Sequence, residues 1–213
     1  MGQNLEVQGI MHLGQPAPAG GVVVSLTSSD PTRLLLAANP GDPGSSLLKL
    51  NVAAGGNQGT YYIQGLGASG TVTYTATAPG YRDRTATVGL GPSGVVIAGP
   101  FGFDVPFAFT TTTSNGPTPI GVFTGLLDPS NGNTLSETQP IRGGLLLIVN
   151  LEINNPSVGS IDSGVLLNGG DDGALANFTP SGVGTAVITV DTPTTVVTTK
   201  SGDNTTVPVK VTN

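Results

Sequence analysis

Glycine or proline interrupts nearly every window of 12 residues in this sequence, and threonine and valine dominate between them. Glycine and proline are the residues least compatible with a helix interior, whereas β-branched residues favour strands. The 33 glycines and 17 prolines make up 50 of the 213 residues, against an average usage of about 12%. Because 37% of the residues are apolar, the composition argues against a disordered chain, and without a Gly-X-Y period it is not a collagen. The sequence therefore predicts an all-β protein.

Short runs of alternating apolar and polar residues follow one another in the first half of the chain. The first run has its apolar side chains at odd positions: Leu5, Val7, Met11 and Leu13. Further runs of the same kind cover residues 22–26, 48–52, 72–76 and 86–88. Clusters of glycine, proline, serine and asparagine bound each run, as turns do. Short strands at this spacing predict a β-sandwich.

The second half of the chain repeats this plan. Its matching points with the first half are Gly143-Gly144 with Gly20-Gly21, Pro156 with Pro31, and Gly184 with Gly70. The separation of matching points shrinks along the chain, as expected if the two copies differ only in loop length. We therefore expect two domains, residues 1–97 and 98–213, with a long loop at 37–47 in the first and a longer loop at 115–142 in the second.

A phenylalanine-rich segment opens the second copy. Its odd positions are all large and apolar: Phe101, Phe103, Val105, Phe107 and Phe109. Pro106 cannot donate a ladder hydrogen bond, so the pattern predicts an edge strand that matches the opening strand of the first copy. We expect its phenylalanines to lie in the core of the second domain. The alternative is an assembly role, in which this strand, or the strand with Leu5, Val7, Met11 and Leu13, is exchanged between domains or chains.

The segment Asn154–Ile161 and the later stretch 178–190 resemble bacterial immunoglobulin-like repeats of the invasin and intimin type. In that family a turn-strand of the form S-N-P-S-V-A-x-V precedes a strand of the form G-x-A-x-I-T-V. The first copy resembles the pattern more loosely, at 27–31 and 70–76. The sequence departs from it in lacking the usual core tryptophan. The resemblance implies two tandem immunoglobulin-like Greek-key β-sandwiches.

The same resemblance implies a non-catalytic structural repeat of a bacterial extracellular or cell-surface protein or filament. Such a repeat acts as a spacer, or assembles by strand-mediated contacts with copies of itself or with neighbouring Ig-like domains. The alternative is an adhesion module that binds a glycan or a protein receptor through its end loops. A third hypothesis is an enzyme accessory domain or a phage decoration module. The first residues lack the basic and apolar segments of a signal peptide, so the chain is either cytoplasmic or a piece of a longer exported chain. Because of the resemblance, we expect the second.

Little in the sequence points to catalysis or to nucleic acid. The single His12 lies opposite the apolar face of its strand, and no G-x-S-x-G motif supplies a nucleophile, so we expect no catalytic residue and no enzyme. The glycine motifs at 65–70 and 89–94 precede strand-like sequence instead of a helix, so we expect no nucleotide site. The net charge is −6 and the basic residues are scattered, which argues against nucleic acid. The longest aliphatic run, 145–149, is too short for membrane insertion.

Metal binding has only weak candidates. The chain has no cysteine, which excludes disulfides and zinc–thiolate sites. Asp171 and Asp172 lie in a glycine-rich turn and could donate oxygens to calcium, which needs 6–8 of them. Two adjacent side chains of an extended chain point in different directions. We therefore expect a solvated hairpin turn there, and no cofactor.

Overall fold

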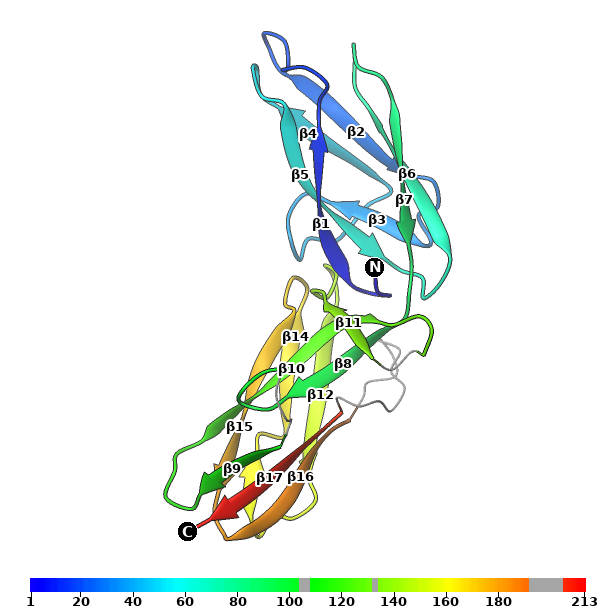
Figure 1. Ribbon diagram of the computed structural model, residues 1–213. Coiled ribbons are helices and arrows are strands. Elements are labelled where there is room, and N and C mark those ends of the chain that lie inside the picture. The colour runs from blue at the N-terminus through cyan, green and yellow to red at the C-terminus, as the bar shows by residue number, and fades with distance from the viewer. Residues whose placement is uncertain (104–107, 132–133, 192–204) are drawn as a thin grey trace. The chain divides into compact units, whose positions relative to one another are not determined.

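The computed structural model describes residues 1–103, 108–131, 134–191 and 205–213. Every regular element in these residues is a β-strand, which confirms the predicted all-β class (Figure 1). No helix in this part of the chain has the length and apolarity needed to cross a membrane. The chain divides into two compact units. Unit 1 comprises residues 1–91, 139–145 and 168–170, and unit 2 comprises residues 92–138, 146–167 and 171–213.

Unit 1 is a β-sandwich of two antiparallel sheets. Its strands are β1 (Glu6–His12), β2 (Val22–Ser28), β3 (Leu34–Ala37), β4 (Leu47–Val52), β5 (Gln58–Gly65), β6 (Thr71–Thr77) and β7 (Arg84–Gly89). One sheet has the order β1-β5-β3 and the other the order β4-β2-β6-β7. Buried side chains from both sheets form a single core, with Leu26 on β2 and Leu36 on β3 among its most buried members.

Unit 2 is a second sandwich with additional strands. Its strands are β8 (Ser93–Ala98), β9 (Phe109–Thr112), β10 (Thr118–Leu127), β11 (Leu135–Thr138), β12 (Leu146–Ile153), β13 (Gly159–Ile161), β14 (Gly164–Asn168), β15 (Gly173–Pro180), β16 (Gly184–Asp191) and β17 (Thr206–Thr212). One sheet has the order β11-β10-β15-β13, with β8 also paired to β10, and the other has the order β14-β12-β16-β17-β9.

The two units share one topology. The pairings β1-β5-β3 and β4-β2-β6-β7 recur in unit 2 as β10-β15-β13 and β14-β12-β16-β17, so β8, β9 and β11 are additions to a common plan. Gly21 and Gly144 precede the matching strands β2 and β12, and both have φ 77°, a conformation that favours glycine. The predicted pair of Ig-like sandwiches is therefore confirmed. The exact domain boundaries remain a prediction, and β8 lies in unit 2.

The alternating pattern predicts which side chains of a strand are buried. On β12, Leu147 and Val149 are buried while their neighbours Leu146 and Ile148 are 54% and 60% exposed. Successive side chains of a strand point to opposite faces of the sheet. A run of five aliphatic residues can therefore form a strand with one face buried and the other exposed to solvent.

The phenylalanine-rich segment does not form the predicted continuous strand. Phe101 is 71% exposed and lies in a turn closed by Gly102 N–H, which donates to Gly99 O at 3.1 Å. Gly102 has φ 89°, which an extended strand does not allow. The described strand β9 begins only at Phe109. The counterpart of β1 is therefore β10, and residues 104–107 lie outside the described part of the chain.

The predicted loop at 115–142 is wrong as a loop, because it contains β10 and β11. The prediction of a loop followed from the assumption that the two copies differ only in loop length. In the structure β10 pairs with β15 from Thr118↔Phe178 to Phe123↔Gly173, and Ile120 and Val122 are fully buried. Long-range pairing therefore overrides the weak local strand preference of this segment.

The turn after β2 in unit 1 is the same as the turn after its counterpart β12 in unit 2. In unit 1 Asp30 Oδ1 accepts a hydrogen bond from Thr32 Oγ1 at 2.6 Å, and in unit 2 Asn155 Oδ1 accepts one from Ser157 Oγ at 2.7 Å. In each case the proline lies between the two residues. A short polar side chain that closes its own turn is the reason such turns favour Asp, Asn and Ser.

The residue before this turn ties it to the neighbouring strand. Asn154 N–H donates to Val187 O at 3.1 Å, and Val187 N–H donates to Asn154 Oδ1 at 2.8 Å. In unit 1, Ser29 N–H donates to Thr73 O at 2.9 Å, and Thr73 N–H donates to Ser29 Oγ at 3.2 Å. The side chain thus replaces one rung of the backbone ladder.

Removing this side-chain rung should destabilise each unit. We expect Asn154→Ala to lower the unfolding free energy of unit 2, and Ser29→Ala that of unit 1, by about 1 kcal/mol, because each leaves one backbone N–H without its acceptor. Urea denaturation followed by circular dichroism measures the loss. Asn150→Ala, at an exposed position of β12, is the matched control and should change little; an equal loss there would contradict the role of the rung.

Candidate functional site

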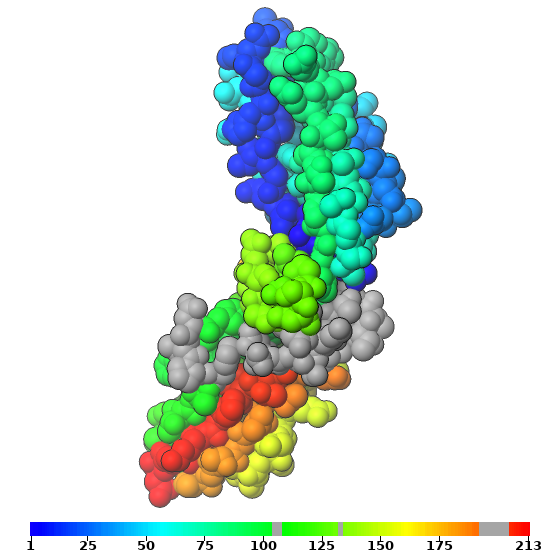
Figure 2. Space-filling view, turned by 45° about the vertical axis from the view of Figure 1, so that its right-hand side comes forward, coloured from blue at the N-terminus to red at the C-terminus, as the bar shows by residue number. Residues whose placement is uncertain are grey.

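A cleft of about 550 Å³ lies in unit 1 between β1 and β7, the edge strands of its two sheets. In Figure 2 the two strands lie side by side, β1 in blue and β7 in green. Met11 and Leu13 line the cleft from the β1 side and Ala86 lines it from β7. Its floor includes Val24 and Leu26, which are buried core residues of β2. The cleft therefore opens directly onto the core of unit 1.

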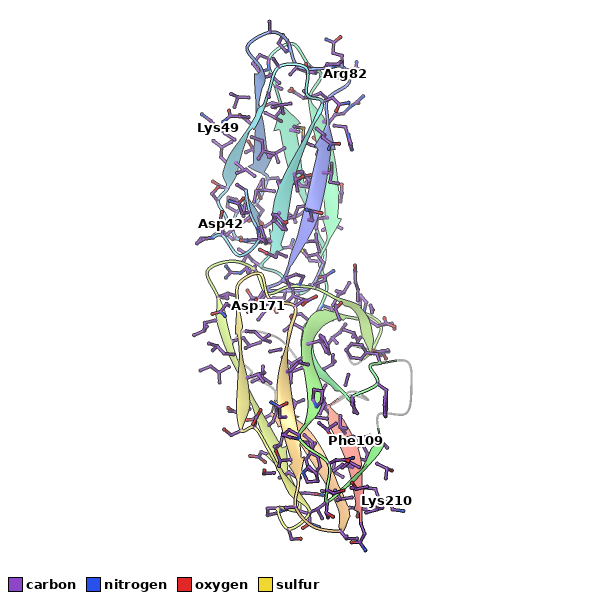
Figure 3. The ribbon with its side chains drawn as sticks, turned by 90° about the vertical axis from the view of Figure 1, so that its left-hand side faces the viewer. Asp42, Lys49, Arg82, Phe109, Asp171 and Lys210 are labelled. Carbon is purple, nitrogen blue, oxygen red and sulfur yellow. The ribbon has the colours of Figure 1, made fainter. Side chains whose placement is uncertain are left out.

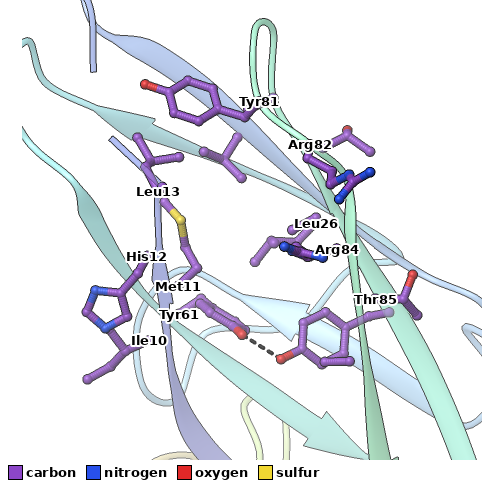
Figure 4. Close-up of a pocket in the computed structure, with 17 residues that line it drawn as sticks. Ile10, Met11, His12, Leu13, Leu26, Tyr61, Tyr81, Arg82, Arg84 and Thr85 are labelled. Carbon is purple, nitrogen blue, oxygen red and sulfur yellow. Dashed lines mark hydrogen bonds between the residues drawn. The ribbon is translucent and has the colours of Figure 1, made fainter. Parts of the chain in front are cut away.

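Two hydrogen-bonded tyrosines line this cleft, and Figure 4 labels one of them, Tyr61. Tyr61 on β5 and Tyr74 on β6 are only 4% and 8% exposed, and their hydroxyl oxygens lie 2.6 Å apart in a hydrogen bond. Their rings are edge to face, with centroids 5.9 Å apart. Tyr61 pairs with Gly9 on β1, where a Cβ atom would lie 2.5 Å from Tyr61 Cζ. Glycine is thus required at position 9 so that β1 can pass over the ring.

Burial raises the pKa of Tyr61 well above its ordinary value of 10, and the hydrogen bond with Tyr74 adds to the effect. A pKa that is higher in the folded state means that the folded chain holds this proton more tightly. The contribution to stability is therefore complete below pH of about 10 and is lost as the pH rises above the unfolded-state value.

We expect the stability of unit 1 to fall more steeply above pH 10 in the native chain than in a Tyr61→Phe variant. The variant has no proton to lose at this position, and Tyr74 is the one titrating group that loses a hydrogen-bond partner. Denaturation midpoints measured between pH 9 and 11 give the two slopes. Parallel slopes would show that Tyr61 does not carry the effect.

The rim of the cleft has a hydrogen bond between two loops and two arginine side chains. The Tyr81 hydroxyl, from the β6–β7 loop, donates to Pro16 O at 3.1 Å and so links that loop to the chain that follows β1. Arg82 and Arg84 line the β7 side. In Figure 4, Met11 points into the cleft while His12 points away from it.

The chemistry of the lining suits binding. Its residues include no Asp, Glu, Ser or Cys, and His12 points away from the cleft in Figure 4. Apolar walls with a few polar groups are typical of a surface that takes up an apolar partner. The sequence alone did not predict this site, because Tyr74 lies in the alternating run 72–76 whereas Tyr61 lies in no predicted run.

A buried carboxylate lies elsewhere in unit 1. Glu6 is fully buried. Its Oε1 accepts from Gly41 N at 2.9 Å, and its Oε2 accepts from Gln64 Nε2 at 2.9 Å and from Gly143 N at 3.2 Å. A buried charge needs several such donors. The three donors explain why a carboxylate is tolerated there, and they point to a structural role.

The assembly residues predicted for the opening strand region face inward. Leu5 is fully buried and forms an isolated antiparallel bridge with Ile141, a residue of unit 1. Val7, Met11 and Leu13 are partly buried and pack against the core of unit 1. The structure thus brings these four residues together on one face of the sandwich. Whether they are exchanged between chains remains a prediction.

The phenylalanines proposed for the same role are separated by the structure. Phe109 is 5% exposed and packs edge to face on Phe178, with ring centroids 5.8 Å apart (Figure 3). Phe103 packs on Phe123 at 5.0 Å, whereas Phe101 is exposed. Val105 and Phe107 lie outside the described residues. Phe109 thus contributes to the core of unit 2, as one of the two sequence interpretations predicted.

The calcium candidates lie in the turn between β14 and β15 (Figure 3). The carbonyl oxygen of Asp172 accepts from Thr124 N at 2.9 Å, which is an ordinary backbone contact. In the described part of the chain, no three His, Cys, Asp or Glu residues gather closely enough to hold a metal ion. The absence of a cofactor remains a prediction.

No family model and no curated protein matches the chain. Among solved structures, the D0-D1 domains of intimin match at 14% identity and TM-score 0.31, covering 96% of this chain and 87% of that one. Invasin, titled a bacterial integrin-binding protein, matches at 15% identity and TM-score 0.34, covering 97% of this chain and 39% of that one. The adhesin InvE of Yersinia pseudotuberculosis matches at 13% identity and TM-score 0.35, covering 100% and 56%.

These similar structures include intimin and invasin domains, the kind of repeat that the sequence resembles. Calcium-binding domains of CALX1.1 match with the same TM-score of 0.35 at 11% identity, covering 97% of this chain and 93% of that one. Because every one of these scores is below 0.5 and the identities are low, they assign no activity, partner or location to this chain. The fold assignment depends on the strand order and register given above.

Proposed function

We propose that the chain is a non-catalytic structural module of a bacterial extracellular or cell-surface protein, in which it serves as a spacer. Its partners are other modules of the same kind. The module has neither a nucleic-acid nor a membrane-inserted role.

The observation that supports this function is the duplicated topology. Both units repeat one strand order, one proline turn and one side-chain rung. Such repetition is expected of a protein built from copies of one structural module. In unit 1 the residues that line the cleft include no carboxylate, serine or cysteine. With charged residues at only 9% of the chain, the charges provide little long-range attraction for a substrate.

Immunogold electron microscopy tests the proposal. Antibodies raised against the chain should label intact cells of the bacterium that produces it, and mild proteolysis of those cells should remove the label. A cytoplasmic protein labelled in parallel is the control and should become accessible only after lysis. Label that appears only after lysis would contradict an extracellular role.

Adhesion through an end loop is the second candidate, because the loop after β3 is largely exposed at residues 38–46. Asn39 Nδ2 donates to Asp42 Oδ2 at 2.7 Å and shapes the tip of this loop. A glycan array probed with the native chain and with an Asn39→Ala, Asp42→Ala variant tests this function. Binding that the variant loses supports adhesion, and an array without signal supports the spacer role.

A further inference from the structure

In the part of the chain that the structure describes, β8 of unit 2 has no counterpart strand in unit 1. β8 pairs antiparallel with the outer edge of β10, from Gly121↔Ala98 to Leu126↔Ser93, and all of its residues are buried. It also contacts β16 and β17 in the facing sheet. β8 therefore closes the side of unit 2 that lies between its two sheets. Among the described residues, no strand of unit 1 pairs with β1 except β5.

The strands β1 and β10 can be aligned by register. The shared proline turn fixes β3 against β13, and the pairing of these strands with β5 and β15 makes Ile63 the counterpart of Phe178. Ile63 pairs with Val7, and Phe178 pairs with Thr118. Val7 therefore corresponds to Thr118, with no insertion along the rest of either strand.

This alignment places the cleft of unit 1 where β8 lies in unit 2. Residues 10–13 of unit 1 correspond to residues 121–124 of unit 2, which pair with residues 95–98 of β8. Residues 10–13 are also the part of the first strand region that lines the cleft. One unit thus has a filled site and the other an open one at the same position.

The open edge presents backbone groups to this space. Leu13 N–H donates to Asn57 O at 2.7 Å, on the β5 side. Backbone groups alternate in direction along an antiparallel strand, so the N–H and C=O of Ile10 and His12 turn toward the cleft side. Ile10 is 55% exposed. Unpaired edges of this kind are sites at which another strand can add.

We propose that the cleft of unit 1 is a strand-acceptor groove for an extended apolar segment with the pattern of β8, donated by another module of this kind. The segment lies antiparallel to β1, and alternate small aliphatic side chains, as at Val95 and Ile97, enter the cleft above Leu26. The proposal deepens the proposed function, on which it depends for the identity of the donor. It concerns the acceptor, whereas the exchanged strands predicted from sequence were donors.

The chain's own β8 cannot fill this groove. An antiparallel strand there must begin beside the end of β1 at His12, yet Gly91, the residue that precedes Pro92 and β8, pairs with Gly2 near the start of β1. From Glu6 to His12, β1 covers six steps, or about 20 Å. Pro92 alone spans at most about 3.6 Å. The donor must therefore be another chain or module.

A peptide with the sequence of residues 92–100 tests the groove on the intact 213-residue chain. We expect the labelled peptide to bind at least about tenfold more tightly than the same peptide with Val95→Asp and Ile97→Asp, because each charge would enter an apolar cleft. Fluorescence anisotropy measures both affinities. Equal affinities would overturn the proposal.

Register is tested by disulfide trapping, which is clean because the chain has no cysteine. His12 corresponds to Phe123, which pairs with Val96, so a His12→Cys chain should crosslink to a Val96→Cys peptide. A Ser93→Cys peptide, whose cysteine would lie three residues further along, is the control and should crosslink at least about fivefold less, since paired Cα atoms must lie within about 7 Å. Equal crosslinking of both peptides would show non-specific contact and overturn the register. The cell-labelling experiment does not involve the groove, so either proposal can fail alone.

Discussion

Gly9→Ile is expected to destabilise unit 1 by about 3 kcal/mol, and the loss should be largely recovered when unit 2's side chains are installed around it. A Cβ at position 9 would lie 2.5 Å from the Tyr61 ring, and overpacking of a core typically costs about 1–3 kcal/mol. In unit 2 the corresponding pair is Ile120 opposite Ala176. In unit 1 the large side chain of the pair is on β5, whereas in unit 2 it is on β10.

The variants that test this exchange are Gly9→Ile, Tyr61→Ala and their combination. Tyr61→Ala alone should cost about 3–5 kcal/mol through the cavity it leaves, and the double variant should be more stable than Tyr61→Ala. Adding Tyr74→Ile, to match Ile188, also removes the hydroxyl that has lost its partner. Urea denaturation of the set gives the coupling energy. If the losses of unfolding free energy from Gly9→Ile and Tyr61→Ala were additive, the two side chains would not compete for the same space in the core.

Glu6→Ala is expected to destabilise unit 1 by about 3–5 kcal/mol. The substitution leaves the Gly41 N–H, the Gly143 N–H and the Gln64 amide buried without their acceptor, and removing one partner of a buried charged network is among the most damaging changes. Glu6→Gln keeps one acceptor oxygen and should lose less. Thermal and urea unfolding of the intact chain measure both.

The matched control is Glu152→Ala, which removes an exposed carboxylate from β12 and should change the unfolding free energy by less than about 0.5 kcal/mol. If Glu6→Ala were as mild as this control, water or rearranged backbone would have to satisfy the three donors, and the structural role of Glu6 would be wrong.

Several strands could be predicted because their alternation is local. The runs at 22–26, 48–52 and 72–76 became β2, β4 and β6, with the alternating apolar residues of each on the inner face and Val23 on the outer face. β3 and β5 were not predicted. β3 is a short aliphatic run without alternation, and β5 begins beside a glycine in a turn-like context. Such strands form only because neighbouring strands supply their hydrogen bonds.

The candidate site was beyond local prediction for a related reason. Within the described residues, no strand lies beside the outer edge of β1, whereas β8 lies beside β10. Neither arrangement follows from the local sequence of these strands. The phenylalanine-rich segment shows the same limit, because its alternating pattern was stronger than that of β10. Gly102 nevertheless directs the chain into a turn, and β10 takes the place that corresponds to β1.

The sequence by itself determined the all-β class, the duplication and the turn chemistry, since glycine, proline, asparagine and β-branched residues act on the backbone within a few positions. Only the tertiary structure decided which strands correspond, where a carboxylate is buried and which sandwich is left open. Those outcomes depend on pairing between segments far apart in the chain, where the free energy comes from burial and hydrogen bonds that no single segment contains.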